Sequence, residues 1–213
     1  MKQLKLIFAG LLLLVCVSAC KKDSGTNAGF DPAQYYIAGV RVVNYKTNFA
    51  IIFTPGGASR QLTVGGSLVS AGSYQYNGSH LKITDATFGD ADLTIINNAI
   101  TDYAGNTGFA DASLLRIPGN DAFAGKKFQG QLRLNNESTA IACTIQFSTD
   151  SKFGFRFNSS DFTSPTAPYT LQNNAVATGN SNGQFLLVMA NGKLLVSTSN
   201  DSNQMYGEFS QVI

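Results

Sequence analysis

Strand-like alternation is the feature that most restricts the fold of this 213-residue chain. After residue 34, apolar and polar residues alternate in short runs, and a period of two places successive side chains on opposite faces of a β-strand. No stretch repeats apolar residues at helical spacing over three turns. The pattern therefore predicts an all-β protein. Large apolar residues recur at this period in Val40–Val42, Phe49–Phe53, Leu62–Val64, Leu81–Ile83, Leu132–Leu134 and Phe153–Phe157.

Turn signals separate these runs and predict hairpins. Asn77-Gly78 and Asn191-Gly192 each lie between two alternating segments. Asn-Gly favours the positive φ angles that a two-residue type I′ turn requires at both central positions. Because the chain also combines short strand-like runs with 21 glycines, we expect an antiparallel meander.

The chain also repeats itself at a spacing of 92 to 95 residues. Four matches that hold this spacing within three residues favour a tandem duplication. We expect two similar β-barrel or β-sandwich modules, lipocalin-like in pattern, with six to eight strands each. One larger fused barrel or sandwich with a pseudo-twofold axis is the alternative. The matches are Gly39–Asn44 with Gln131–Asn135, Phe49–Phe53 with Cys143–Phe147, Tyr74–Tyr76 with Tyr169–Leu171, and Leu93–Ile100 with Leu186–Leu194.

The N-terminus has the three parts of a secretory signal. Lys2 and Lys5 supply positive charge, an apolar run extends from Leu6 to Val17, and small residues follow. The run is shorter than the roughly 20 apolar residues that a membrane-spanning helix needs. We therefore expect a signal peptide that is removed from the mature protein.

The end of this signal resembles the lipobox of bacterial lipoproteins. Val17, Ser18, Ala19 and Cys20 match its order of one branched apolar residue, two small residues and a cysteine. The resemblance implies that signal peptidase recognises Val17, Ser18 and Ala19 and cuts before Cys20. It also implies that Cys20 carries lipid, and two or more acyl chains anchor a protein stably to a membrane.

These observations divide the chain into five parts. The polar segment after Cys20 has almost nothing apolar to bury and is expected to be a flexible tether. Pro118-Gly119-Asn120-Asp121 is the expected joint between the two modules. The parts are a signal peptide (1–19), the lipidated cysteine and tether (20–33), a first β module (34–117), a linker (118–123) and a second β module (124–213).

Charge argues against a nucleic-acid partner. The chain has 15 basic and 13 acidic side chains, and removal of the signal peptide deletes Lys2 and Lys5 and no acid. The mature protein is therefore neutral and lacks the basic surface that binds nucleic acid. The start Cys20–Ser24 and the Asn/Ser/Thr/Gly-rich body resemble envelope lipoproteins of Bacteroidota, some of which bind sugars on tandem β domains. Lys21 after the cysteine resembles an outer-membrane retention signal, with the leaflet left open.

Few residues suggest chemistry. The only histidine, His80, alternates with Leu81 and Ile83 and should point to solvent. Asp85, Asp90 and Asp92 are weak candidates for a calcium site, although aspartates of this kind more often stabilise turns. Cys143 is predicted to be a buried core cysteine, because it lies on the apolar face of its strand.

Two arginines occupy matching positions in the repeats. Arg41 and Arg133 are each flanked by two apolar residues that are expected to point inward. Both arginines should therefore face outward, or into a surface that the modules share. No catalytic constellation and no cofactor motif is present in the sequence.

The sequence thus favours a non-enzymatic binding or interaction module, held to the membrane by lipid and related to glycans or envelope proteins. The alternative is a lipocalin-like carrier of a small hydrophobic ligand, suggested by the meander pattern and the richness in phenylalanine.

Overall fold

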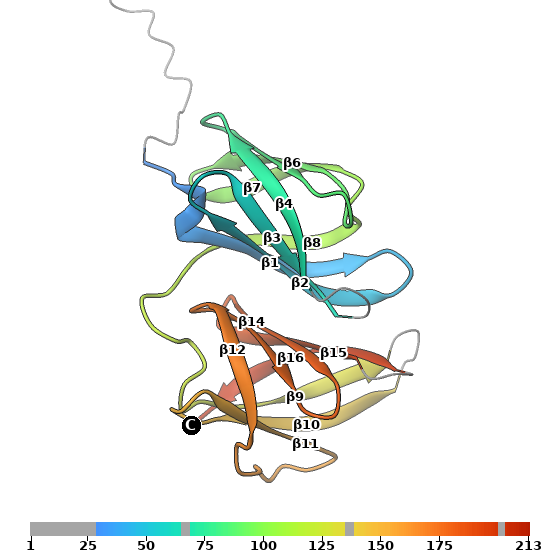
Figure 1. Cartoon of the computed structure of the whole chain (residues 1–213). Coiled ribbons are helices and arrows are strands. Elements are labelled where there is room, and N and C mark those ends of the chain that lie inside the picture. The colour runs from blue at the N-terminus through green and yellow to red at the C-terminus, as the bar shows by residue number, and fades with distance from the viewer. Residues whose placement is uncertain (1–28, 65–68, 135–138, 200–202) are drawn as a thin grey trace, which may run out of the picture.

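The computed structural model describes residues 29–64, 69–134, 139–199 and 203–213. It contains two tandem eight-stranded antiparallel barrels, which confirms the all-β prediction and the two-module architecture (Figure 1). The fused-barrel alternative is wrong, because the strands of each half pair only with one another. The predicted lipobox Val17–Cys20, the signal peptide and most of the tether lie outside the described residues.

The first barrel follows a single 3₁₀ turn, η1 (Pro32–Gln34), which Asp31 caps through a bond from the Ala33 amide to its carboxylate. Its strands pair in chain order, and β8 returns to pair with β1. β7 and β8 form the two edges, so this barrel is nearly closed. Its strands are β1 (Tyr35–Val42), β2 (Lys46–Thr54), β3 (Ala58–Leu62), β4 (Val69–Tyr76), β5 (His80–Thr84), β6 (Ala91–Ile96), β7 (Ala99–Gly105) and β8 (Phe109–Arg116).

The second barrel repeats this order and closes completely, because its last strand pairs with its first. The two barrels therefore have the same number and order of strands, as a tandem duplication predicts. Its strands are β9 (Lys127–Leu134), β10 (Ala140–Phe147), β11 (Lys152–Phe157), β12 (Ala167–Asn173), β13 (Val176–Asn180), β14 (Gln184–Ala190), β15 (Lys193–Ser199) and β16 (Gln204–Val212).

One predicted type I′ turn is present and the other is not. Asn191 and Gly192 have φ angles of 49° and 78°, as a type I′ hairpin between β14 and β15 requires. At Asn77-Gly78 only Gly78 has a positive φ, and the connection has three residues. The Asn77 side chain accepts a hydrogen bond from the His80 amide at 2.9 Å, which closes this longer loop.

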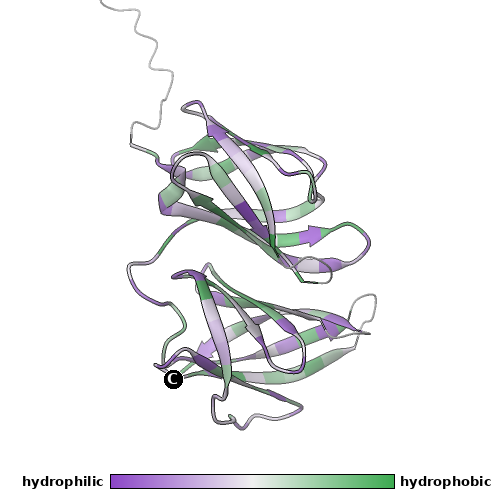
Figure 2. Ribbon diagram, viewed as in Figure 1, coloured by the Kyte–Doolittle hydropathy of each residue, from purple (hydrophilic) through white to green (hydrophobic). Residues whose placement is uncertain are grey.

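Each barrel has its own apolar interior. Alternate residues of β2, such as Phe49 and Ile51, point inward in the first barrel, and Cys143 and Ile145 of β10 do so in the second. The hydrophobic residues, green in Figure 2, lie along the strands of both barrels.

A third apolar cluster lies between the barrels and joins them. The outer faces of β1 and β2 pack against β14, and β2 also contacts β15 and β16, which places the barrels one above the other in Figure 1. Polar contacts border the cluster: Asn48 Nδ2 donates to the carbonyls of Val196 at 2.8 Å and Gly207 at 3.3 Å. We call this cluster the inter-barrel core; its buried residues are Tyr36, Ala38, Ala50, Ile52, Leu62, Val64, Ala175, Val176, Leu186, Val188 and Ala190.

Candidate functional site

The three aspartates proposed for calcium have separate partners. Asp85 is buried; its Oδ1 accepts the Thr87 amide at 2.8 Å, and its Oδ2 accepts the Ser70 hydroxyl. Asp90 accepts the Asp85 amide at 3.2 Å, and Asp92 lies 3.1 Å from His80. Among the described residues, no three metal-ligating side chains converge. The Asp85 contacts are those of a turn-stabilising aspartate.

His80 lies on the surface, as the alternation of its strand predicts. Its side chain is 49% exposed and its Nδ1 is paired with Asp92 across the β5–β6 ladder. A catalytic histidine must contact a nucleophile as well as an orienting acid. No nucleophile contacts His80 within the part of the chain that the structure describes.

The sequence predicts that both repeat arginines face outward or into a surface that the modules share, and this prediction holds for Arg133 and is wrong for Arg41. Arg133 is exposed on β9. Arg41 lies on the same face of β1 as Ile37, which points into the first barrel. The apolar run misled the prediction, because Val42 and its neighbour Val43 are the exposed residues, at 47% and 58%.

Arg41 lines a cavity of about 170 Å³ at one end of the first barrel. We call this cavity the mouth pocket. Arg41 Nε donates to the Thr107 carbonyl at 2.6 Å, and its guanidinium carbon lies 4.8 Å from the centre of the Phe88 ring. Burial lowers the pKa of Arg41, while the nearby Tyr45 and Asp85 act in the opposite direction. The lining residues are Arg41, Val43, Asn44, Tyr45, Thr47, Thr63 and Phe88.

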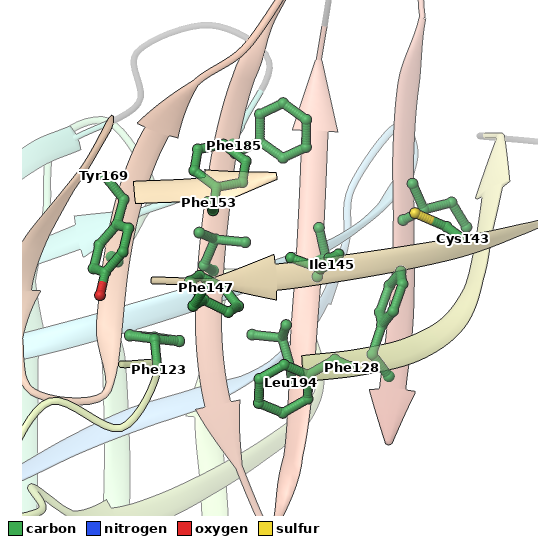
Figure 3. Packing of buried hydrophobic residues seen from close by; sticks show 14 residues of the cluster. Phe123, Phe128, Cys143, Ile145, Phe147, Phe153, Tyr169, Phe185 and Leu194 are labelled. Carbon is green, nitrogen blue, oxygen red and sulfur yellow. The ribbon is translucent and has the colours of Figure 1, made fainter. Parts of the chain in front are cut away.

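Side chains fill the middle of the second barrel, in contrast to the mouth pocket of the first (Figure 3). Phe147 touches four other aromatic rings, with centroid distances between 5.2 and 6.3 Å. The buried Ile145 and Leu194 occupy the space beside these rings. An apolar ligand of the lipocalin kind would have to displace this packing.

A second hollow lies on the outside of the second barrel. It is an open groove of about 500 Å³ between the outer faces of β9 and β10 and the loop that follows β11. Polar amide and hydroxyl side chains border it. We call it the loop groove; its lining residues are Gln129, Gly130, Gln131, Ala142, Cys143, Thr144, Asn158, Ser159 and Ser160.

Hydrogen bonds hold the loop against the barrel, so the groove is a built feature. Gln129 Nε2 donates to the Ser160 carbonyl at 3.2 Å, and Thr144 Oγ1 donates to the Asp161 carbonyl at 2.8 Å. The Asn158 amide donates to the carbonyl of Ala142 at 2.8 Å.

Sequence reasoning missed both hollows. The loop groove combines β9 with a loop some 30 residues later, and only the strand register brings the two together. One signal was present: the stretch Asn158–Ser164 is almost entirely polar and follows a strand of three phenylalanines.

Protein-family models, curated proteins and solved structures yield no match to this chain. Within the residues that the structure describes, no helix is long and apolar enough to cross a membrane.

Proposed function

We propose that this protein is an outer-membrane lipoprotein, anchored through Cys20, whose two barrels form a non-enzymatic binding module for glycans. The loop groove is the observation that carries this proposal. Sugars present many hydroxyl groups, and amide and hydroxyl side chains such as Gln131, Asn158 and Ser160 can donate to and accept from them.

The groove also has the dimensions and openness of a site for a chain. Its volume of about 500 Å³ is about three times that of the mouth pocket. The loop after β11 borders the groove on one side. Its lining includes the exposed Ala142, which has no long side chain to obstruct a ligand. An open polar groove suits an internal segment of a polysaccharide, because the chain can leave the site at both ends.

Substitution of the groove residues tests the glycan proposal. A soluble form spanning residues 21–213 should retain polysaccharides in affinity electrophoresis or on a glycan array. Gln131→Ala and Asn158→Ala should each weaken binding by about fivefold to tenfold, the value of one or two hydrogen bonds. Gln34→Ala, an exposed glutamine of the first barrel, is the matched control. Uniform lack of binding across glycans of varied composition would overturn the proposal.

The anchor has its own test, independent of the ligand. Cys20→Ala in the precursor should abolish labelling by a radioactive or clickable fatty acid and should release the protein from the membrane fraction. Cys16→Ala is the matched control, because that cysteine lies inside the signal peptide and should not affect either result. Unchanged labelling of the Cys20→Ala precursor would contradict the lipoprotein assignment.

A further inference from the structure

The two barrels are duplicates by strand order, so equivalent positions can be compared across them. The pairing registers define the equivalences directly. On this basis Arg41 in the first barrel corresponds to Leu132 in the second, and not to Arg133. The pairs that establish this are Arg41 with Thr47 and Gly39 with Phe49 in one barrel, and Leu132 with Ile141 and Gly130 with Cys143 in the other.

The inner face of the third strand differs in the same way. Ser59 and Gln61 face Phe53 and Ile51 in the first barrel, where the second barrel has phenylalanines facing Phe147 and Ile145. A polar stripe therefore replaces an aromatic one beside the mouth pocket. The equivalent residues are Ser59 with Phe153 and Gln61 with Phe155, and Thr63 continues the polar stripe two residues after Gln61.

Part of this polar stripe is buried without a partner. Gln61 is 2% exposed and Thr63 is 4% exposed. Within the part of the chain that the structure describes, neither end of the Gln61 amide nor the Thr63 hydroxyl has a hydrogen-bond partner. Buried polar groups of this kind cost about 1–3 kcal/mol each, and proteins keep them where a water or ligand completes the bonding.

Arg41 is positioned to donate hydrogen bonds to a ligand in the pocket. Its bonds to the Thr107 and Phe88 carbonyls use Nε and one terminal nitrogen, and the Phe88 ring supports the guanidinium plane. A guanidinium has five N–H donors, so it can still donate to a further acceptor. Thr63 lines the same cavity, and Gln61 lies two residues earlier on the same strand face.

We propose that the mouth pocket binds a small carboxylate-bearing ligand, with the carboxylate on Arg41 and a polar group of the ligand on Thr63. The planar fork of a guanidinium matches a carboxylate in a bidentate arrangement. Asp85, whose carboxyl group already accepts the Ser70 hydroxyl and the Thr87 and Phe88 amides, lies near enough to act on Arg41. Its presence favours a singly charged ligand over a phosphate dianion. A cavity of about 170 Å³ accommodates a molecule of monosaccharide size.

Titration of residues 21–213 with paired probes tests this site. The probes are glucuronate, acetate, glucose and inorganic phosphate. Binding of each probe is measured by calorimetry and by the shift of the NMR signals of the Gln61 side-chain amide. Glucuronate should bind and shift those signals, acetate should bind more weakly, and glucose, which lacks the carboxylate, should not bind. Binding of phosphate without binding of either carboxylate, or binding of none of the four probes, would overturn the proposal.

Variants separate the arginine from the fold. Arg41→Gln should weaken glucuronate binding by about 100-fold, because it removes the charge and the fork. Arg133→Gln is the matched control and should leave binding unchanged. Because Arg41 also bonds to two loops, its substitution can affect folding, and a second variant is needed. The nearly isosteric Thr63→Val should weaken glucuronate binding by about fivefold to tenfold. Its melting temperature should stay the same or rise. Equal affinity in Thr63→Val and the unmodified protein would contradict the assigned contact.

This site is independent of the loop groove. Gln131→Ala should leave glucuronate binding unchanged, so failure of the glycan proposal and failure of the carboxylate proposal give different results.

Discussion

Cys143 is a residue whose position on a strand decides its chemistry. The alternation of β10 turns its side chain into the second barrel, where it is 2% exposed among apolar neighbours (Figure 3). Burial raises the pKa of the Cys143 thiol to about 12, and a backbone hydrogen bond from Arg156 opposes the shift only partly. The thiolate is the reactive form of cysteine, so this residue is inert in the folded protein.

Thiol labelling should therefore report unfolding of the second barrel. In a form spanning residues 21–213, Cys143 is the only cysteine. We expect no reaction with an aromatic disulfide reagent at pH 8 in the native protein and one thiol per chain in denaturant. Rapid reaction of the native protein would show that the strand does not bury this side chain.

The raised pKa of Cys143 also predicts a pH dependence of stability. The unfolded thiol has a pKa near 9.0 and the folded thiol a pKa of about 12. The folded state therefore holds the proton more tightly, so stability that is complete below pH 9 is lost as the pH rises toward 12. Between pH 8 and pH 10 the loss should be about 1 kcal/mol in denaturant unfolding. Cys143→Ala, although less stable overall, should lose less over this interval; equal losses would contradict the pKa assignment.

Arg41 and Cys143 mark how far single residues can be predicted from the sequence. Cys143 is predicted correctly because its strand has its large apolar residues at one parity only. Arg41 lies in the run Gly39–Asn44, where Val40, Val42 and Val43 are all apolar, so the pattern assigns the wrong face. Only the register with β2 shows that Arg41 follows Ile37 and Gly39 on the inward side.

At the scale of elements, the duplication was the most reliable prediction. The match of Phe49–Phe53 with Cys143–Phe147 is correct in register as well as in pattern, because both segments place the same alternate residues inward. Turn chemistry was reliable at Asn191-Gly192 and not at Asn77-Gly78, where Ser79 joins the loop. The inter-barrel core was not predicted, because a buried outer face gives strands that are apolar on both sides and so have no alternation to detect.

Close approach of strands at each barrel seam depends on glycine. A Cβ atom on Gly207 of β16 would lie 2.0 Å from the Gln131 carbonyl oxygen, and one on Gly39 of β1 would lie 1.9 Å from the Asp111 carbonyl oxygen. Both contacts are to backbone, so the strands themselves would have to move apart. At Gly39 and Gly207, the seams between the first and last strands therefore have no room for a side chain.

Gly207→Ala should accordingly destabilise the second barrel by about 3 kcal/mol or more, measured by urea unfolding. Gly119→Ala is the control, because a Cβ there meets no atom within 4 Å. It should leave stability unchanged or raise it by about 0.5 kcal/mol through the unfolded state. Similar effects of the two substitutions would show that the seam is not as tight as these contacts require.

The whole molecule depends on an asymmetric contact between its two halves. The outer face of β1 and β2 in the first barrel packs on β14 of the second, and β2 also contacts β15 and β16. The equivalent outer face of the second barrel, on β9 and β10, instead has Gln129, Gln131 and Thr144 and is covered in part by the loop after β11. The two barrels are therefore joined through an apolar outer face of one barrel, whereas the equivalent face of the other barrel is polar. The polar face on β9 and β10 leaves the loop groove exposed.

This arrangement predicts that the two barrels unfold together and can be uncoupled without breaking either one. Leu186 and Leu187 are neighbours on β14, both fully buried; Leu186 points into the inter-barrel core and Leu187 into the second barrel. The unmodified protein should show a single calorimetric transition. Leu186→Asp places a charge where only separation of the barrels can hydrate it, so we expect two transitions with native-like circular dichroism below the first.

Leu187→Ala should lower the stability of the second barrel by about 2–5 kcal/mol through a cavity and retain the coupling. Two transitions in the unmodified protein, or a single one after Leu186→Asp, would mean that the inter-barrel core does not couple the halves.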